Sequence, residues 1–222
     1  MAEQLHSGDH DLETIVFERR SIRGYTEQAV PREVLEDVIR IAQRAPSSMN
    51  TQPWHFHVLT GDPLERVRKG NTEKMVAGSS IDREITLNHA YEGPHRDRQV
   101  EIAVQLFEAM GIARDDNLRR QDWVIRGFRQ FDAPVSVVIT VDTELANDTI
   151  AHFDCGAATY GTVINGQGIM QSSVVRENAN IPADQVIMTC VAMGYPDEDF
   201  VANHVQSRRA TDGSVVSFVG FD

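Results

Sequence analysis

The sequence predicts an α+β fold in which helices surround a small mixed central sheet. Two nearly continuous apolar runs, 135–141 and 186–193, are typical of strands buried on both faces. Most other apolar residues recur at helical spacing, without a strict alternation of strand and helix. Because 222 residues suffice for one sizeable core, we expect a single domain over residues 1–222.

The first third of the chain is predicted to hold two helices and one strand. Apolar residues have helical spacing from Asp11 onward, and Asp9 or Asp11 is positioned to cap that helix. Pro31 is well suited to open a second helix, which Pro46 ends. The run 54–60 predicts the first strand.

The middle of the chain, about residues 70–130, is more polar and less regular than the rest. Helical patterns are visible at 63–77 and 98–112, and we expect 115–131 to be helical in part. Long polar insertions often carry function. We therefore predict that residues 70–130 form a lid or an insertion over a functional site.

The last third begins with the buried strand at 135–141. A long helix is predicted at 148–170, and its small residues would let another helix approach closely, including one from a second copy of the chain. The second buried strand at 186–193 follows, and 215–221 is expected to form a last short strand or an extended tail.

Charge and hydropathy exclude several kinds of partner. The net charge of −12 disfavours nucleic acid and anionic membrane surfaces. There is no apolar leader segment and no run of eighteen apolar residues, so we expect a cytoplasmic protein that neither is secreted nor spans a membrane.

The cysteines and a histidine pair are expected to be structural. Cys155 and Cys190 lie in apolar runs and form no C-x-x-C motif, which predicts two buried, reduced thiols. His55 and His57 would lie on the same side of a strand and could form a metal pair. Since no third ligand is apparent nearby, we expect no metal site.

Positive charge is carried mainly by arginine, with only two lysines against nineteen arginines. The segment Arg19-Arg20-Ser21-Ile22-Arg23 places three guanidinium groups and a hydroxyl within five residues. Such a group can surround one dianion with charge-assisted hydrogen bonds. The alternative is a solvated basic turn.

A second segment, residues 45–54, holds a run of polar residues between its two prolines. Its hydroxyl and amide groups could bind the polar edge of a heteroaromatic ring. An ordinary connecting loop is the alternative. A third group, Ser207-Arg208-Arg209, would by itself be a surface arginine pair.

Taken together, these segments resemble the nitroreductase family of FMN enzymes. The run from Arg19 to Tyr25 is similar to its R-R-S-x-R-x-[FY] motif, and 45–54 is similar to its A-P-S-x-x-N-x-Q-P-W loop. Gly194-Tyr195-Pro196, followed by Arg209 and a V-V-x-x-x-G-F tail, resembles its C-terminal pattern. The resemblance covers residues 11–222, and is loose over 70–130.

This resemblance implies an intertwined homodimer with a nitroreductase-like FMN fold. The implied activity is reduction of nitroaromatic compounds, to nitroso and then hydroxylamine products, with NAD(P)H as the reductant. No G-x-G-x-x-G follows a predicted strand, so a separate dinucleotide site is not expected. This agrees with a ping-pong scheme in which flavin N5 carries the chemistry, and no catalytic side chain is assigned.

The resemblance also assigns residues to the cofactor. It implies that FMN is bound by three groups of residues. The arginine-rich group consists of Arg19, Arg20, Ser21, Arg23 and Arg209. A loop from the partner subunit contributes Pro46, Ser47, Ser48 and Asn50, and the stretch near N5 consists of Gln171, Ser172 and Ser173. The aromatic side chains of the lid that could stack on a substrate are Tyr91, Trp123 and Phe128, although core packing is an equal alternative for Phe128. Arginines of the lid could meet the anionic parts of NAD(P)H, namely Arg96, Arg98, Arg119 and Arg120.

Two departures from the family pattern are visible. Ser207 occupies a position where the family often has lysine, and Gly166-Gln167-Gly168 replaces a G-L-G motif. Two other functions stay open: reductive dehalogenation of halotyrosine-like substrates, and flavin binding without turnover. The lack of any lysine after Lys74 argues against dehalogenation, because that subgroup uses a lysine of the lid to bind its amino-acid substrate.

Overall fold

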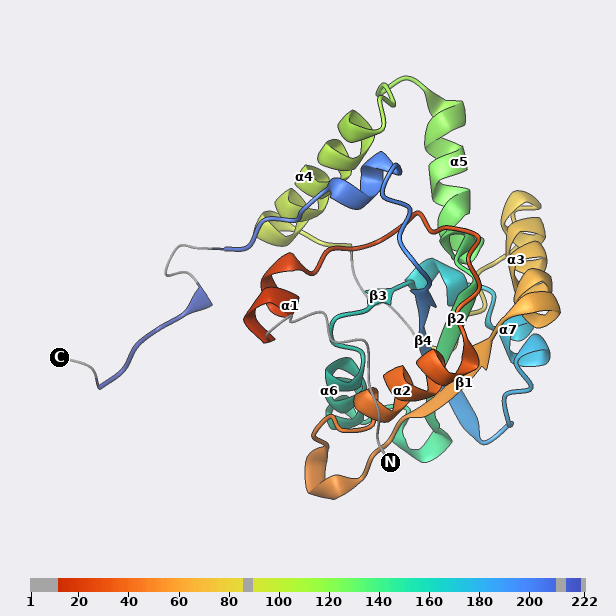
Figure 1. Cartoon of the computed structure of the whole chain (residues 1–222), viewed down its shortest axis with the longest axis vertical. Coiled ribbons are helices and arrows are strands. Elements are labelled where there is room, and N and C mark those ends of the chain that lie inside the picture. The colour runs from red at the N-terminus through yellow and green to blue at the C-terminus, as the bar shows by residue number, and fades with distance from the viewer. Residues whose placement is uncertain (1–11, 86–89, 211–214, 221–222) are drawn as a thin grey trace.

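The computed structural model describes residues 12–85, 90–210 and 215–220 (Figure 1). Its strands are β1 (His55–Leu59), β2 (Val135–Asp142), β3 (Val163–Ile164) and β4 (Gln185–Met193). Its α-helices are α1 (Leu12–Glu18), α2 (Arg32–Ala42), α3 (Gly61–Val76), α4 (Gly93–Ala109), α5 (Asn117–Phe128), α6 (Thr149–Ala158) and α7 (Ser172–Asn178). The 3₁₀ turns are η1 (Ser48–Asn50), η2 (Gln130–Asp132), η3 (Thr143–Leu145), η4 (Gly166–Ile169) and η5 (Val201–His204).

The sheet has the order β1-β2-β4-β3, and each pairing is antiparallel. The α+β class is confirmed, but the expectation of a mixed sheet is wrong for the described residues. A continuous apolar run cannot tell strand direction, because antiparallel central strands covered on both faces have the same pattern. Here the amide of Thr143, just after β2, donates to the carbonyl of Asp184, just before β4. The chain therefore re-enters the sheet at the end where β2 left it.

The two faces of the sheet are covered by different helices. Alternate residues of β2, including Val137 and Ile139, pack into a core with Leu35 of α2 and Cys155 of α6. Val138 points to the other face, into a second core that includes residues of α3 and α7. Figure 1 shows α3 and α7 at the right of the sheet, with α6 across from them. This two-sided burial explains why β2 and β4 lack a polar face.

The predicted helix at 148–170 is wrong, because α6 ends at Ala158. Gly161 adopts a left-handed backbone with φ of +86°, which turns the chain out of the helix. Val163 and Ile164 then pair with β4 as β3. The backbone N–H and C=O groups of this segment form hydrogen bonds with the edge of β4, in place of the hydrogen bonds that they would form within a longer helix.

The middle of the chain is more regular than expected. It forms two long helices, α4 and α5, which stand side by side at the top of Figure 1. The Arg119 guanidinium closes the turn between them by donating to the carbonyls of Met110 (2.8 Å) and Gly111 (2.7 Å). Helix α4 starts at Gly93, five residues before the predicted start, and α3 matches the predicted 63–77 closely.

The other predictions differ only in detail. Helix α2 follows Pro31 as expected but ends at Ala42, before Pro46. The possible caps Asp9 and Asp11 lie outside the described residues. The described part of the tail, 215–220, forms no strand and extends away from the body (Figure 1). No helix in the described ranges is both long and apolar enough to cross a membrane.

Candidate cofactor site

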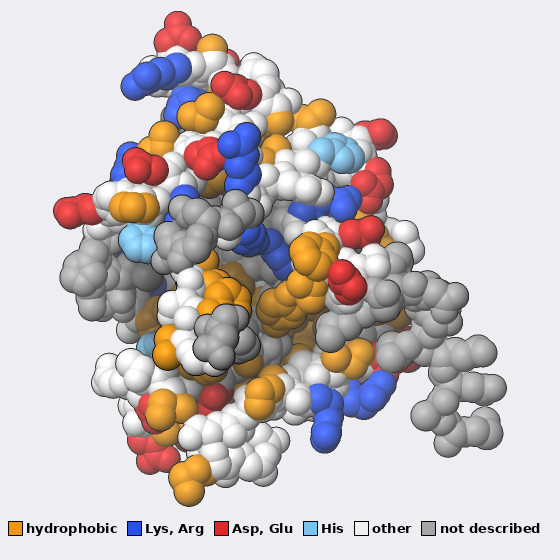
Figure 2. Space-filling model, turned by 90° about the vertical axis from the view of Figure 1, so that its left-hand side faces the viewer, with side chains coloured by type: hydrophobic (Ala, Val, Ile, Leu, Met, Phe, Trp, Pro, Cys, Tyr) orange, Lys and Arg blue, Asp and Glu red, His pale blue; other side chains and the backbone are white. Residues whose placement is uncertain are grey.

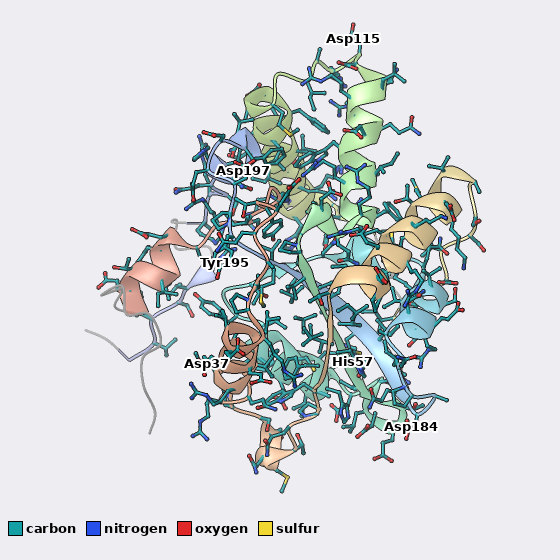
Figure 3. The ribbon with its side chains drawn as sticks, turned by 45° about the vertical axis from the view of Figure 1, so that its right-hand side comes forward. Asp37, His57, Asp115, Asp184, Tyr195 and Asp197 are labelled. Carbon is teal, nitrogen blue, oxygen red and sulfur yellow. The ribbon has the colours of Figure 1, made fainter. Side chains whose placement is uncertain are left out.

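The arginine-rich segment is held in place by the C-terminal part of the chain. After α1, residues 19–25 run beside residues 195–203, and Tyr25 forms an isolated antiparallel bridge with Pro196. The amide of Thr26 donates to the carbonyl of Tyr195 at 2.9 Å, and the amide of Asp197 donates to the carbonyl of Gly24 at 3.1 Å. Figure 3 shows Tyr195 and Asp197 beside this segment. Two of the three sequence motifs therefore meet in one chain.

A single buried side chain fixes this meeting. The Oδ1 atom of Asn203 accepts from the amides of Arg23 (2.7 Å) and Gly24 (3.1 Å), while its Nδ2 donates to the carbonyls of Gly24 (2.8 Å) and Asp197 (2.9 Å). All four hydrogen-bonding positions of the amide are used. A Cβ atom on Gly24 would lie 2.3 Å from the ring of Phe200, so only glycine fits there.

A cavity of about 380 Å³ opens beside the arginines. Arg19 and Arg20 line it, together with Pro196 and Glu198. Arg20 pairs with Glu198 at 3.2 Å, but its Nε is buried and has no hydrogen-bond partner in the described part of the chain. Burial lowers the pKa of Arg23, and the nearby charge of Arg19 lowers it further. An anion that accepts from these donors would relieve both the unpaired donor and the crowding of positive charge.

The loop before β1 has an unusual backbone. Met49, Asn50 and Gln52 have φ values of 49°, 61° and 47°, in the left-handed region that side chains disfavour. Such strain persists only where surrounding contacts enforce it, and it often marks a binding loop. Two bonds of Ser47 close the loop: its carbonyl accepts from the amide of Asn50 at 3.1 Å, and its Oγ accepts from the amide of Gln52 at 3.0 Å.

A carboxylate that sequence analysis missed positions this loop. Asp154 of α6 is 5% exposed, and its Oδ2 accepts from the amide of Ser48 at 3.0 Å. The available signal was an acidic residue inside an otherwise apolar part of the helix, between Phe153 and Cys155. Buried carboxylates of this kind are uncommon without a partner.

Gln171 directly precedes α7, and Ser172 and Ser173 are the first two residues of that helix. Gln171 is 1% exposed, and its Oε1 has no partner among the described residues. Ser173 is exposed; its Oγ accepts from Lys74 Nζ at 2.8 Å and donates to Asp82 Oδ2 at 2.5 Å. Burial opposes ionisation of Asp82, but the hydrogen bonds from Ser173 and the charge of Lys74 outweigh it and lower the pKa of Asp82. These contacts tie the segment after α3 to the start of α7.

The three predicted substrate aromatics have different surroundings. Tyr91 is 59% exposed just before α4. Trp123 is half-buried and stacks on Phe200, with ring centroids 6.4 Å apart and planes at 16°. Phe128 is 3% exposed in the packed interior, so its side chain serves core packing, the alternative considered for it. Only Tyr91 and Trp123 are available to a ligand.

Arg209 does not join the other arginines within one chain. It is exposed, its guanidinium donates to the carbonyl and Oγ of Ser207 (2.9 and 2.6 Å), and it lines a separate pocket against α4. Within the described ranges, no hydrogen bond or ion pair links it to the segment at 19–23.

Figure 2, which looks onto the side of the molecule that carries α1, shows a hollow near the middle of this face, bordered by basic side chains.

The histidines and cysteines have structural surroundings. His55 Nε2 lies 3.0 Å from Asp142, and His57 Nε2 lies 3.0 Å from Thr140 Oγ1 and 2.9 Å from Gln185 Oε1. No cluster of three metal-ligating side chains is found among the described residues. Burial raises the pKa of the two cysteines, to about 11 for Cys155 and about 12 for Cys190, so neither thiol is a ready nucleophile.

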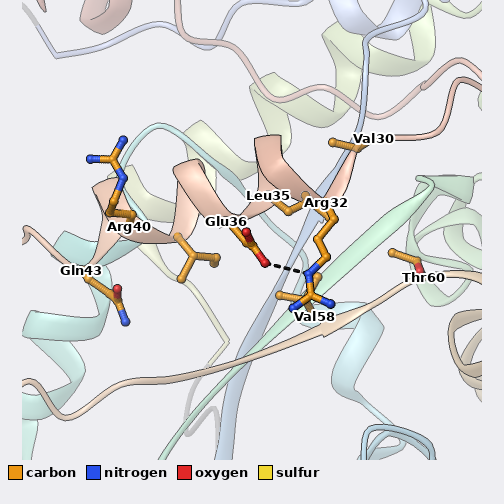
Figure 4. Close-up of a pocket in the computed structure, with 9 residues that line it drawn as sticks. Val30, Arg32, Leu35, Glu36, Arg40, Gln43, Val58 and Thr60 are labelled. Atoms are coloured by element: carbon orange, nitrogen blue, oxygen red, sulfur yellow. Dashed lines mark hydrogen bonds and ion pairs between the residues drawn. The ribbon is translucent and has the colours of Figure 1, made fainter. Parts of the chain in front are cut away.

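A larger cavity lies away from all these motifs. It has a volume of about 600 Å³ and separates α2 from β1 (Figure 4). Leu35, Ile39 and Val58 form its apolar wall, and the Arg32–Glu36 ion pair borders it at 2.7 Å. None of the predicted cofactor residues lines it, and β1 forms the edge of the described sheet here.

The architecture is that of an α+β protein with the nitroreductase fold. The chain superposes on the structure of "FMN and NADPH-dependent nitroreductase NfnB" from Sphigopyxis sp. strain HMH with a TM-score of 0.88, at 26% identity, covering 96% of this chain and 100% of the other. The chain belongs to the nitroreductase family, whose model matches residues 16–195.

Named relatives cover nearly the full chain. It is 30% identical to the "Nitrobenzene nitroreductase" of Ectopseudomonas oleovorans and 29% identical to the "Chloronitrobenzene nitroreductase" of Comamonas testosteroni. Each alignment covers 94% of this chain and 96% of the relative. The resemblance inferred from the three motifs is thereby confirmed.

Proposed function

We propose that this protein is an FMN-dependent oxidoreductase that uses NAD(P)H to reduce nitroaromatic compounds. The observation that carries the proposal is the pinned arginine segment, in which Arg20 keeps a buried, unpaired Nε beside a cavity of about 380 Å³. That arrangement fits the phosphate end of FMN. The printed names of the relatives, which include nitrobenzene and chloronitrobenzene nitroreductases, support the choice of substrate.

We propose that different parts of the chain bind the phosphate, the ribityl chain and the ring of FMN. Arg19, Arg20, Ser21 and Arg23 hold the phosphate and ribityl parts of the cofactor. Gln171, Ser172 and Ser173 line the ring, and the buried, unpaired Oε1 of Gln171 is suited to accept a hydrogen bond there. The chemistry that bound FMN supplies is two-electron transfer at N5, from NAD(P)H to the nitro group and on to the hydroxylamine level. The chain binds, orients and excludes water.

The placement of the two motif groups supports a homodimer. Figure 1 shows the loop between α2 and β1 at the lower end of the molecule, whereas the segment after α1 crosses its upper half. This placement suits a site to which two subunits each contribute one of the groups. We therefore propose that Pro46, Ser47, Ser48 and Asn50 reach the flavin of the partner subunit.

Exposed apolar side chains support the same assembly. Phe17 of α1 is 77% exposed, Met49 97% and Phe153 of α6 79%. In the tail, Val215 and Val219 are 60% and 86% exposed. Large exposed apolar surfaces usually mark an interface. We propose that α1, α6 and the loop at Met49 meet their counterparts, and that the tail of one subunit covers the edge of β1 in the other.

Helices α4 and α5 are proposed to form a lid within the single domain. Tyr91 precedes α4, and Trp123 lies on α5 against Phe200. Both aromatic rings are suited to stack on a flat nitroaromatic substrate. Trp123 stacks on Phe200, and the same Phe200 ring packs against Gly24, so α5 and the arginine segment are in contact through this ring.

The test begins with the purified protein. FMN should bind tightly to the apoprotein and give a yellow complex that anaerobic NADPH bleaches and nitrobenzene re-oxidises. A colourless protein that refuses FMN would refute the proposal. A yellow protein that NADPH cannot bleach would instead support flavin binding without turnover, and reoxidation by iodotyrosine but not nitrobenzene would support dehalogenation.

A further inference from the structure

The arginine segment, residues 19–23, has a second anchor in the lid helix α5, whose end lies beside the segment that follows α1 (Figure 1). Arg126, in the last turn of α5, donates from Nη2 to the carbonyl of Arg23 at 3.1 Å. Asn203 binds the amides of Arg23 and Gly24 from the other end of the chain. Both peptide groups that flank the Cα atom of Arg23 are therefore held by distant side chains. Because peptide groups are planar, holding both fixes the two backbone dihedrals of Arg23.

The side chain of Arg126 is 19% exposed and closely surrounded. Its Cζ atom lies 4.8 Å from the centroid of the Phe200 ring, and its Nη1 lies 3.2 Å from Asp132 Oδ2. Its Nε is buried and has no hydrogen-bond partner in the part of the chain that the structure describes. Burial lowers the pKa of Arg126, although the charge of Asp132 opposes this. A charged group with an unpaired donor is costly to bury, so its other contacts must offset that cost.

The ion pair with Asp132 does not by itself account for Arg126. Arg129 already donates to both oxygens of this carboxylate, at 3.0 and 3.1 Å. Tying the end of α5 to η2 therefore needs no second guanidinium. The contacts that set Arg126 apart from Arg129 are its hydrogen bond to residue 23 and its packing on Phe200. Both lead to the arginine segment.

We propose that Arg126 is a positioning residue of the cofactor site. By holding the carbonyl of Arg23, it sets the direction in which the Arg23 side chain leaves the backbone and meets the phosphate and ribityl parts of FMN. Among the described residues, the Arg23 guanidinium makes one hydrogen bond, from Nη1 to the carbonyl of Ser21 at 3.3 Å. Its placement therefore depends on the backbone that carries it. This inference rests on the proposed function, which assigns Arg23 to the cofactor.

The variant Arg126→Met tests the assignment, because it removes the donor and keeps an unbranched side chain. Arg129→Met is the matched control. It removes the same charge from the same end of α5, together with a partner of Asp132, but no contact with the arginine segment. The affinity of each apoprotein for FMN is measured by fluorescence titration. Arg126→Met should weaken binding about tenfold, the size expected for a hydrogen bond from a charged donor, and Arg129→Met by less than about twofold.

Repeating the substitution in an Arg23→Ala background separates positioning from charge. A positioning residue has no effect once the side chain that it positions is absent, so Arg126→Met should then change FMN affinity by less than about twofold. A loss that persists in this background, or an equal loss in Arg129→Met, would overturn the proposal while the proposed function stands. If the wild-type apoprotein does not bind FMN, the proposed function fails and this assignment fails with it.

Thermal unfolding of each apoprotein checks that the variants are folded. If Arg126→Met does not fold, Arg126→Lys takes its place, with Arg129→Lys as the control. Lysine keeps the charge but has a single donor group, so it cannot reach both Asp132 and the carbonyl of residue 23 with the geometry of a guanidinium. Its loss of FMN affinity should be smaller than that expected for methionine, and it should again vanish in the Arg23→Ala background. A loss of the same size in both backgrounds would contradict the positioning role.

Discussion

The side-chain amide of Asn203 encloses the backbone of Gly24, accepting from its amide at 3.1 Å and donating to its carbonyl at 2.8 Å. The two residues are 179 positions apart in the sequence. Asn203 is fully buried, so solvent cannot replace these hydrogen bonds. The shape of the arginine segment therefore depends on the opposite end of the chain, and weakening this contact should affect stability and cofactor binding together.

Replacing Asn203 with alanine should lower the free energy of unfolding by about 2–4 kcal/mol, because each buried polar group left unpaired costs about 1–3 kcal/mol. FMN affinity should fall as well, since the amide of Arg23 loses its acceptor. Urea titration and flavin titration measure the two effects. Asn117→Ala, at the exposed start of α5, is the control. Unchanged stability in Asn203→Ala would contradict the role given to this amide.

Gly24→Ala should be destabilising although it adds only a methyl group. The new Cβ would lie 2.3 Å from the Phe200 ring, and forcing it in should cost about 1–3 kcal/mol. Displacement of Phe200 should also disturb its stacking on Trp123, which tryptophan fluorescence would report. The control is Gly166→Ala, where the added Cβ meets nothing within 4 Å. Equal effects of the two substitutions would show that the close approach is not limiting.

Asp154→Ala should weaken FMN binding although Asp154 is not among the residues proposed to contact the cofactor. The substitution removes the acceptor of the Ser48 amide and frees the loop at 47–52 to leave its left-handed conformation. Asp154→Asn keeps an acceptor oxygen, so it should retain most of the affinity. Flavin titration of both variants, with thermal unfolding as a check on folding, separates positioning from stability. Equal weakening of FMN binding by Asp154→Asn and Asp154→Ala would contradict a positioning role for the carboxylate of Asp154.

Acid should release the segment after α3. The pKa of Asp82 in the folded protein lies below its ordinary value of 3.8. Its contribution to stability is therefore present above pH 3.8 and is lost as the pH falls below that value toward the lowered pKa. Urea unfolding of the wild type and of Asp82→Asn is measured between pH 6 and pH 3. The free energy of unfolding of the wild type should exceed that of the variant at pH 6, and this difference should shrink as the pH falls toward 3. Parallel curves for the two proteins would exclude this contribution.

The sequence predicted the elements of the fold better than their arrangement. The apolar runs of β2 and β4 are easy to recognise as strands because helices cover both faces of the sheet. The same apolar pattern is expected for parallel and for antiparallel strands, so it does not predict strand direction. The break after Ala158 depends on pairing between β3 and β4, residues that are far apart in the chain. Gly161 is a local signal that the helix ends, but no local pattern shows that residues 163–164 pair with β4.

The candidate site was predictable only as far as its motifs. The resemblance named Arg23 and Ser48, but not the residues that hold them. Asn203 and Asp154 bind the backbone amides of these residues across more than a hundred positions in the sequence. Phe128 shows the converse limit. An aromatic residue in a polar stretch has the same appearance in sequence whether it faces a ligand or the core, and here it is buried.

The central claim is that each flavin site combines the arginine segment of one subunit with the loop at 46–50 of the other. Arg20→Ala and Asn50→Asp should each abolish activity alone. Refolding an equal mixture should restore about one quarter of the wild-type activity, since about half of the dimers are then mixed and one of their two sites is intact. If the mixture stays inactive while both variants form dimers, the site lies within a single chain and the account is contradicted.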